Sequence, residues 1–380
     1  MKQRFFLFAA MAILATLTAS LPAATIDELT TTVNAIGLDG QGYPEAVEAV
    51  QALSKLDAPA IPQILASFDD EKPIAANWLR AAVEAVAQRG RDAGSPLPEA
   101  TLVAFINDDS HSAKARGVAF QLLKIQDQAA AKQLIPSFEN DPSLELRLLA
   151  VDRLMQEAKG QAESDQKQAA IATYRQALTA SRNANQANDI AKALKDLGEE
   201  VDTSEHFGFV KNWHVIAAFD FAKGDGFDAV YPPETEIDLN ARYPSKLLDE
   251  IKDPAKWQPL TVEPGKRHVD FNQAFAPVKE VVGYAVTTFD SDEAQDVELR
   301  WGSPNGTKVW LNGELVGRNR VYHAGDNFDQ YMAKVKLKPG ENTILVKVVQ
   351  NEQTQSWTNV WHFDLRVCDH LGTAIRDAKP

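Results

Sequence analysis

Three stretches in the first half of the chain repeat one layout: "QILASFDDE", "TLVAFINDD" and "QLIPSFEND". Their phenylalanines, Phe68, Phe105 and Phe138, recur at intervals of 37 and 33 residues, and a second helical stretch follows each copy. One pair of helices cannot bury its own apolar face, so copies with this period must stack side by side. The repeat therefore predicts an α-solenoid. Other positions in register are Leu65, Leu102 and Ile135 before the phenylalanines, Asp70, Asn107 and Asn140 after them, and Arg80, Arg116 and Arg147 near the start of the second helices.

The third copy predicts how a second helix begins. Asp141 can cap this helix with Pro142 at its first position, where the missing N–H leaves no hydrogen bond unmade. An apolar face then recurs with helical spacing. This face consists of Leu144, Leu148, Val151 and Met155.

The repeats resemble HEAT repeats over roughly residues 45 to 158, including the prolines Pro62 and Pro136 within first helices. One further helix pair is expected between residues 166 and 198, with Gly198 as its C-terminal cap. This last pair looks closer to a tetratricopeptide repeat. The resemblance implies a helical domain of about four pairs that offers an extended surface to a protein partner.

The apolar period changes from helical to alternating after residue 209, and we place a domain boundary near residue 205. Eight short segments with period two predict an antiparallel β-sandwich. Asn312-Gly313, between two of them, predicts a type I′ hairpin turn. The strand candidates are "NWHVIAAFD", "VVGYAVTTFD", "DVELRWG", "KVWL", "ELVG", "QYMAKVKLK", "NTILVKVVQ" and "WHFDLRVCD". The expected inward side chains are Val297, Leu299, Trp301, Ala333, Val335, Leu337, Ile344, Val346, Val348, Trp361, Phe363, Leu365 and Val367, with Lys334, Lys336, Lys347, Asp364 and Arg366 on the opposite faces.

"KVWLNGELVG", "VKLKPGENTILVKVVQ" and "WHFDLRV" resemble the galactose-binding-like jelly roll that serves as the sugar-binding domain of family 2 glycoside hydrolases. The resemblance covers roughly residues 208 to 372. It implies carbohydrate or cell-envelope glycan as the ligand. Related domains often carry an Asp-Asp pair that holds calcium before the hairpin, but this chain has Ser303, Pro304 and Asn305 there. The departure weakens the inference of calcium at that loop.

The N-terminus has the three parts of a secretory signal peptide: Lys2 and Arg4, an apolar run of roughly 15 residues, and "SLPAAT". Cleavage near Ala23 or Ala24 would release an exported protein, periplasmic or extracellular. The formal net charge of −14 disfavours nucleic acid and anionic membranes as partners, and no later segment is long enough to span a membrane. The lone cysteine, Cys368, excludes an intrachain disulfide.

No catalytic constellation stands out in the sequence. The acidic loop around Asp225, Asp228 and Glu234 could bind a structural calcium ion, or it could be a solvated loop of an acidic protein. Nucleophile and nucleotide motifs are absent, and no room remains for a glycosidase domain, so no enzyme is expected. The seven histidines lack the close spacing of a zinc site. They are His111, His206, His214, His268, His323, His362 and His370.

Aromatic residues of the second half are the candidates for ligand binding, because sugar faces stack on exposed rings. Trp310 is out of phase with Val309 and Leu311, which places it on the other face of its strand. The loop "RNRVYHAGDN" adds donors and a ring, and Trp357 lies in a polar stretch. Ordinary packing and a solvated loop are the alternative. The candidate ligand-binding residues are Trp310, Arg318, Arg320, Tyr322, His323 and Trp357.

The sequence thus predicts an α + β multidomain protein: a signal peptide (1–24), a HEAT/TPR-like α-solenoid (25–204) and a galactose-binding-like jelly roll (205–380). The expected function is non-catalytic binding, with glycan on the jelly roll and a protein partner on the helical repeats. The alternative is a structural or assembly scaffold that binds proteins only.

Overall fold

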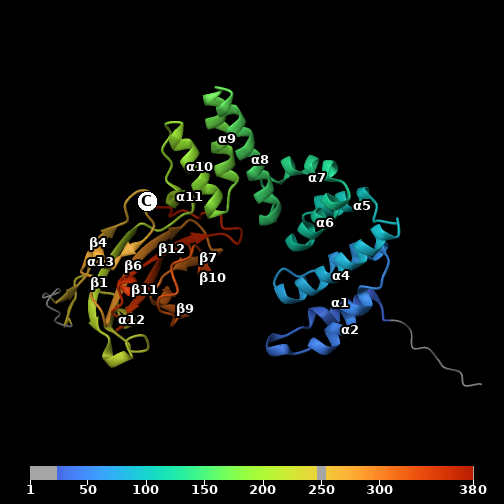
Figure 1. Cartoon of the computed structure of the whole chain (residues 1–380). Coiled ribbons are helices and arrows are strands. Elements are labelled where there is room, and N and C mark those ends of the chain that lie inside the picture. The colour runs from blue at the N-terminus through green and yellow to red at the C-terminus, as the bar shows by residue number, and fades with distance from the viewer. Residues whose placement is uncertain (1–23, 246–253, 380) are drawn as a thin grey trace, which may run out of the picture. The chain divides into compact units, whose positions relative to one another are not determined.

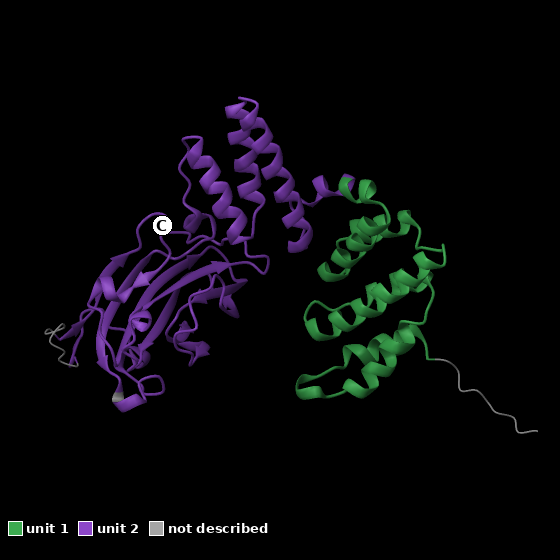
Figure 2. Ribbon diagram, in the orientation of Figure 1, with its two compact units in different colours: residues 1–132 green, residues 133–380 purple. Residues whose placement is uncertain are grey.

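The computed structural model describes residues 24–245 and 254–379, so the predicted signal peptide lies outside the described residues apart from Ala24. Helices occupy the first half of the chain and antiparallel strands the second (Figure 1). The chain divides into two compact units, residues 1–132 and 133–380 (Figure 2). In the described part of the chain, no helix is both long and apolar enough to cross a membrane.

The first unit is built from helices that pack against their neighbours in the chain. Contacts join α1 to α2, α3 to α4 and α5 to α6. Prolines open several of these helices at positions where an N–H is not needed. The elements are α1 (Ile26–Asn34), η1 (Leu38–Gly40), α2 (Tyr43–Leu53), η2 (Ala58–Ala60), α3 (Ile61–Ala66), α4 (Pro73–Asp92), α5 (Glu99–Asn107), α6 (Ala113–Gln126) and α7 (Gln128–Leu134), the last of which crosses the division between the units.

The repeated residues of this unit have the expected roles. Phe68 and Phe105 are buried. Asp70, the turn residue of the first copy, accepts hydrogen bonds from Ser112 Oγ at 2.6 Å and from the Ala113 backbone N at 2.9 Å. The carboxylate thereby satisfies a free N–H at the start of α6 and complements the positive end of that helix. Asp70 of the first copy thus hydrogen-bonds to the start of α6, the second helix of the next copy.

The second unit opens with η3 (Ile135–Phe138), α8 (Leu144–Glu163), α9 (Lys167–Ala180), α10 (Ala184–Asp196) and α11 (Thr203–His206). The predicted cap of α8 was wrong. Ser143, and not Asp141, is the N-cap, because its hydroxyl accepts from Leu146 N. Asp141 supports the cap by accepting from Ser143 N at 2.7 Å. The predicted pair after residue 166 is confirmed as α9 and α10, and Gly198 has the left-handed φ of +86° that ends the pair.

All eight predicted strands are confirmed. With the short strands β4 and β5, which were not predicted, they form a six-stranded sheet, β4-β1-β6-β11-β8-β9, and a four-stranded sheet, β10-β7-β12-β5. Asn312 and Gly313 have φ values of 51° and 84°, as the hairpin between β8 and β9 requires. The strands are β1 (Asn212–Asp220), β4 (Gln258–Thr261), β5 (Val269–Asp270), β6 (Val281–Ser291), β7 (Gln295–Gly302), β8 (Gly306–Leu311), β9 (Glu314–Asn319), β10 (Tyr331–Leu337), β11 (Gly340–Gln350) and β12 (His362–Cys368). Short elements between them are η4 (Ala222–Gly224), α12 (Pro232–Thr235), the paired strands β2 (Arg242–Tyr243) and β3 (Ala255–Lys256), α13 (Phe271–Ala274) and η5 (Ser356–Thr358).

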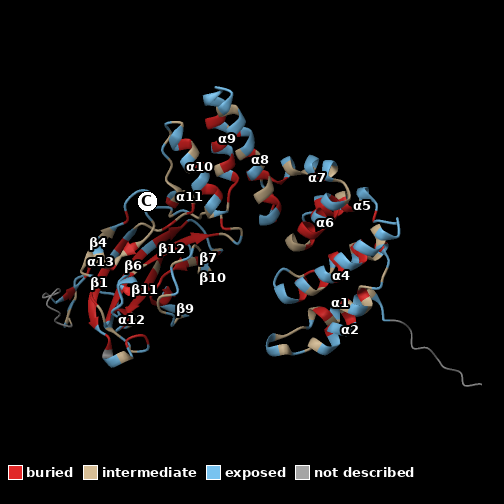
Figure 3. Ribbon diagram, in the orientation of Figure 1, coloured by how far each residue is buried: buried red, intermediate tan, exposed pale blue. Residues whose placement is uncertain are grey.

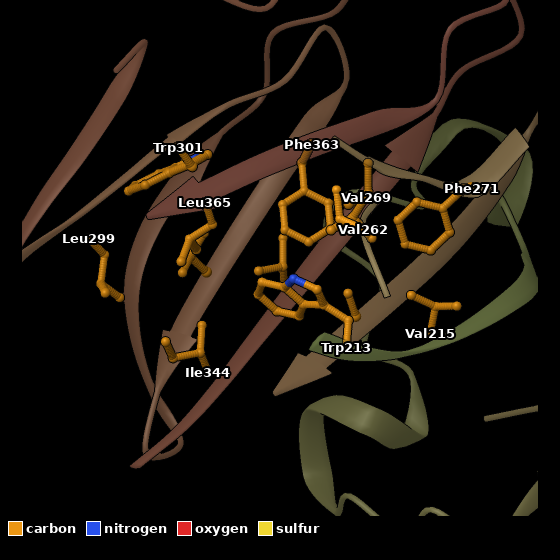
Figure 4. Packing of buried hydrophobic residues seen from close by; sticks show 14 of the residues in the cluster. Trp213, Val215, Val262, Val269, Phe271, Leu299, Trp301, Ile344, Phe363 and Leu365 are labelled. Atoms are coloured by element: carbon orange, nitrogen blue, oxygen red, sulfur yellow. The ribbon is translucent and has the colours of Figure 1, made fainter. Parts of the chain in front are cut away.

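The two sheets face each other across one apolar core (Figure 4). Trp213 of β1 meets Phe363 of β12 edge to face, with ring centroids 5.1 Å apart. Val346 of β11 and Leu299 of β7 are fully buried in the same core. The residues predicted to point inward lie in this core or pack against it, so the alternation of the sequence identified the inner faces correctly.

The outer face of the six-stranded sheet carries a second core, and strands β1, β6 and β11 of this sheet are largely buried (Figure 3). The segment after β1, which we call the covering layer, contributes Phe221 and Phe227. Together with Trp257, these rings pack with Ile216, Phe219, Tyr284, Leu345 and Trp310. Lys347 lies under this covering layer and has no exposed surface. On the other sheet, Asp364 and Arg366 are each 1% exposed because Arg267 contacts Asp364, and Asp329 and Phe207 contact Arg366. Lys334 and Lys336 are exposed, as predicted. Cys368 is also buried and free, and burial raises the pKa of its thiol to about 11.

Helices α9 to α11 are attached to the sheets within the second unit. Ala187 of α10 packs with Phe207 and Phe209, and Arg182 Nε donates to Thr373 Oγ1 at 3.1 Å. Arg366 of β12 donates to the backbone oxygen of Phe207 at 3.2 Å. The change from helices to strands therefore falls near residue 205, as expected, while the division between compact units falls earlier, after Lys132.

Candidate functional site

Three loops meet at one end of the sandwich: residues 303–305, 320–329 and 351–361. The His323 backbone N donates to the Pro304 oxygen, and Asn305 Nδ2 donates to the Val360 oxygen at 3.1 Å. Ser303 Oγ donates to the His362 oxygen at 2.7 Å, and both Ser303 and Asn305 are fully buried. Residues 303–305 thus connect the three loops.

Trp310 does lie on the other face of its strand, but its ring is only 9% exposed beneath the covering layer. It therefore cannot offer its face to a sugar, and the expectation of an exposed ring at this position was wrong. Arg318 and Arg320 are exposed, and each donates to Asp228, at 2.8 and 2.9 Å. These two guanidinium groups fasten the β9 strand end to the covering layer.

Tyr322, His323 and Trp357 are brought together by the structure. The His323 ring lies 5.4 Å from that of Trp357, edge to face, and 6.4 Å from that of Tyr322. Trp357 is 64% exposed, while Tyr322 is half-buried and burial raises its pKa to about 12. His323 Nε2 shares a hydrogen bond of 2.9 Å with Asn351 Oδ1, which fixes the ring beside the indole. We call Tyr322, His323 and Trp357 the aromatic row.

The three candidate calcium ligands do not share one free site. Asp228 is engaged by Arg318 and Arg320, and Glu234 by Lys347 at 2.8 Å. Tyr284 also donates its hydroxyl proton to Glu234. Cationic side chains thus take the place that a calcium ion would have at two of the three carboxylates. Asp225 is exposed.

A different group of metal-ligating side chains converges at the edge of the four-stranded sheet. His268 immediately precedes β5, Asp326 lies in the loop between β9 and β10, and His362 opens β12. Asp326 Oδ2 lies 2.7 Å from His268 Nε2 and 3.2 Å from His362 Nε2. The two imidazole rings stack with centroids 4.2 Å apart. One ligand atom from each residue lies within 4.8 Å of the others. We call these three residues the His2Asp cluster.

Arg267 and Asp364 border the His2Asp cluster. Arg267 Nε lies 2.7 Å from Asp364 Oδ2 and donates to His268 Nε2 at 3.2 Å. Asp364 Oδ1 accepts from Gly302 N at 3.0 Å, whereas Oδ2 accepts no hydrogen bond of good geometry from the described residues. Burial raises the pKa of Asp364 to about 7. Burial also lowers the pKa of His268 to about 4, and that of His362 below its usual value.

Two pockets border this cluster, and His268 lines both. The larger, about 480 Å³, is lined by residues of α10, α11 and the loop before β5, and the smaller, about 290 Å³, by β4 and α13. Lys266, Asp270 and Gln273 also line both. The His268 side chain is 34% exposed. The His2Asp cluster is therefore reachable from solvent.

The spacing of the histidines predicted no zinc site, yet the fold brings two of them together. His268 and His362 are distant in the chain, and Asp326 lies in a loop between them. The antiparallel pairing of β5 with β12 places Asp270 opposite His362, which brings His268 to the same edge. No local motif carries this information, because the proximity arises from strand register and from the path of the loop.

No protein-family model and no curated protein matches the sequence. Among solved structures, a β-glucosidase from Kluyveromyces marxianus aligns with 48% of this chain and 21% of its own, at 13% identity and a TM-score of 0.26. A β-glucuronidase from Faecalibacterium prausnitzii aligns with 39% of this chain and 24% of its own, at 21% identity and a TM-score of 0.23. A family 35 carbohydrate binding module from Clostridium thermocellum aligns with 22% of this chain and 69% of the module, at 15% identity and a TM-score of 0.16. This chain thus corresponds to about a quarter or less of either enzyme, and likenesses of this size assign it neither activity nor ligand.

Proposed function

We propose that this is an exported, non-catalytic binding protein that holds a carbohydrate, such as a cell-envelope glycan, on its β-sandwich. The observation that carries the proposal is the exposed indole of Trp357 beside His323 and Tyr322. In this reading the sandwich is a galactose-binding-like jelly roll, and the aromatic row is the part of it that contacts the sugar.

The chemistry of the aromatic row suits a sugar ring. Trp357, which is 64% exposed, offers apolar surface for the C–H face of a pyranose. A polar side chain lies beside it: His323 packs edge to face against the indole and shares a hydrogen bond with Asn351. His323 Nδ1 has no hydrogen-bond partner among the described residues, although it is buried from water. A few polar groups around a flat apolar surface are the usual composition of a small-ligand site.

A second candidate function is that of a scaffold that binds proteins only, through a HEAT-like α-solenoid. Exposed apolar side chains of the first unit favour it. Leu38, Val47 and Ile74 are 78%, 41% and 36% exposed, so their apolar side chains are available to a protein partner. In the main proposal the same helices present this surface to a partner while the sandwich holds glycan.

Retention on immobilised polysaccharides tests the proposal. We expect the protein to be retained by at least one polysaccharide, and Trp357→Ala and Tyr322→Ala to weaken retention roughly 10-fold or more, the usual effect of removing a central aromatic contact. Met332→Ala is the matched control, because Met332 is an apolar side chain of β10 that is 50% exposed.

Unchanged retention in both aromatic variants would remove the aromatic row from the proposal. A stoichiometric protein partner with no polysaccharide retention would favour the scaffold, and release of sugar products would contradict a non-catalytic role.

A further inference from the structure

We propose that His268, Asp326 and His362 form a zinc-binding site that ties the loop after β9 to strands β5 and β12. The inference is independent of the proposed sugar binding, since it depends on none of the residues of the aromatic row. It begins from the ligand set. Two imidazole nitrogens and one carboxylate oxygen are typical of zinc, and three protein ligands leave a fourth position for water or another molecule.

The distances within the His2Asp cluster fit a shared ion. Zinc lies about 2.0 to 2.2 Å from nitrogen and oxygen ligands, so tetrahedral ligand atoms are about 3.3 to 3.5 Å from one another. Asp326 Oδ2 is 3.2 Å from His362 Nε2 and 2.7 Å from His268 Nε2. The ligand atoms of all three residues lie within 4.8 Å of one another. The spacing is therefore close to that of atoms around one ion, and a turn of the two stacked imidazoles toward that ion would complete the geometry.

One carboxylate oxygen lies against both imidazole nitrogens of the His2Asp cluster. Asp326 Oδ2 is within hydrogen-bond distance of His268 Nε2 and of His362 Nε2, and in each contact the donor depends on the tautomer of the ring. Zinc would replace the protons of these two contacts and bind the three atoms together.

A second carboxyl group lies beside the His2Asp cluster. Asp364 Oδ2 is 3.6 Å from His268 Nε2, and Arg267 contacts both Asp364 and Asp326. Asp364 is 1% exposed, and its Oδ2 accepts no hydrogen bond of good geometry from the described residues. A zinc ion held by the three ligands would stabilise a negative charge on this buried carboxyl group.

Hydrogen bonds to the backbone of His362 and Asp326 hold two of the three ligands in position. The His362 backbone N donates to Asn305 Oδ1 at 3.2 Å, and the His362 oxygen accepts from Ser303 Oγ at 2.7 Å. Arg267 Nη2 donates to the Asp326 backbone oxygen at 2.9 Å, which fixes the loop that carries the carboxylate. Zinc would thus bind to a loop that other contacts already hold in position. Because His268 lines both pockets, the fourth coordination position of the ion would be accessible from them.

The test is a zinc titration of the purified, chelator-treated protein by isothermal calorimetry, with metal content measured after dialysis. We expect one zinc ion per chain and a rise of the thermal midpoint on adding zinc chloride. His268→Gln, Asp326→Asn and His362→Gln should each weaken binding roughly 100-fold or more and lose the thermal shift. His111→Gln, in the first unit, is the matched histidine control and should bind as the parent does.

Two results would overturn the proposal: no stoichiometric zinc on the parent protein, or undiminished zinc on the three variants. Calcium chloride that binds in place of zinc would also contradict it, because calcium prefers oxygen ligands. Circular dichroism of each variant without metal separates loss of binding from loss of fold. Asp326→Asn keeps the size of the side chain in an accessible loop, so it remains informative if either histidine variant fails to fold.

Discussion

Lys347 of β11 and Glu234 of α12 form a buried ion pair, with Nζ 2.8 Å from Oε1. The Lys347 side chain has no exposed surface, and its ammonium also donates to the backbone oxygens of Phe227 and Ala229, at 3.2 and 2.6 Å. Burial lowers the pKa of Lys347 to about 8, with Glu234 opposing the shift. This pair connects the covering layer to a central strand of the six-stranded sheet.

Glu234→Gln should therefore destabilise the second unit by about 3 kcal/mol at pH 7, because it leaves a buried ammonium without its counter-charge. Urea unfolding followed by tryptophan fluorescence would measure the loss. Glu236→Gln, an exposed neighbour, is the control and should change the free energy of unfolding by less than about 0.5 kcal/mol. Equal effects of the two substitutions would show that the buried pair contributes nothing specific.

Asp329 gives the second unit a stability that depends on pH. It accepts from Arg366 at 2.7 and 2.6 Å and from Arg300 at 2.8 Å. Burial alone would raise the pKa of Asp329, but the hydrogen bonds and charges of the two arginines outweigh it and hold the pKa below its usual value. The folded pKa is thus lower than the unfolded one. The stabilisation is present above about pH 4 and is lost as the pH falls through the folded pKa.

Asp329→Asn should cost about 3 kcal/mol at pH 7, since Arg366 is buried and loses its partner. Asn tolerates the left-handed φ of 54° at this position, so backbone strain does not contribute. Urea midpoints of both proteins between pH 3 and 7 would check this. The difference should shrink below about pH 4, and a constant difference would contradict the assignment.

Trp310 and Trp357 should respond in opposite ways to truncation. Trp310→Ala removes a buried ring from the second core and should lower the free energy of unfolding by about 3 to 5 kcal/mol. Trp357→Ala removes a ring that is 64% exposed and should change it by less than about 1 kcal/mol. Chemical denaturation measures both. A large loss in Trp357→Ala would mean that this ring is structural and would weaken its assignment to sugar binding.

Replacing either of two glycines by alanine should lower the free energy of unfolding, but for different physical reasons. A Cβ on Gly283 would lie 2.6 Å from the Phe271 ring and 2.8 Å from that of Trp361, so Gly283→Ala should cost about 1 to 3 kcal/mol through overpacking. A Cβ on Gly313 would meet nothing within 4 Å, but its φ is +84°. Gly313→Ala should therefore cost about 1 to 2 kcal/mol through backbone strain alone.

A second substitution separates the two mechanisms. Phe271→Leu should partly restore the stability of Gly283→Ala, because it removes the atoms that clash, and it should not rescue Gly313→Ala. Thermal unfolding of the single and double variants measures both couplings. Equal coupling of Phe271→Leu to both glycine variants would contradict the distinction.

Local periodicity was enough to predict the helix pairs and eight of the ten strands in the two sheets, but not the short strands β4 and β5. The helix pairs, the eight long strands and the hairpin at Asn312-Gly313 could be predicted because each depends on neighbours a few residues away. The inner faces followed from the same alternation, since a residue on the inner face of a sandwich is apolar whatever lies beyond the sheet.

Only the tertiary structure decided what happens on the outer faces and at the loops. Lys347 alternates as a surface residue does, yet it is buried because the segment after β1 folds back over the sheet. Trp310 is buried for the same reason. His268, Asp326 and His362 meet because strand pairing and a long loop bring together distant parts of the chain. Alternation along a strand shows which residues share a face of the sheet. Whether that face is buried depends on segments distant in the chain that pack over it, and no local sequence pattern predicts those contacts.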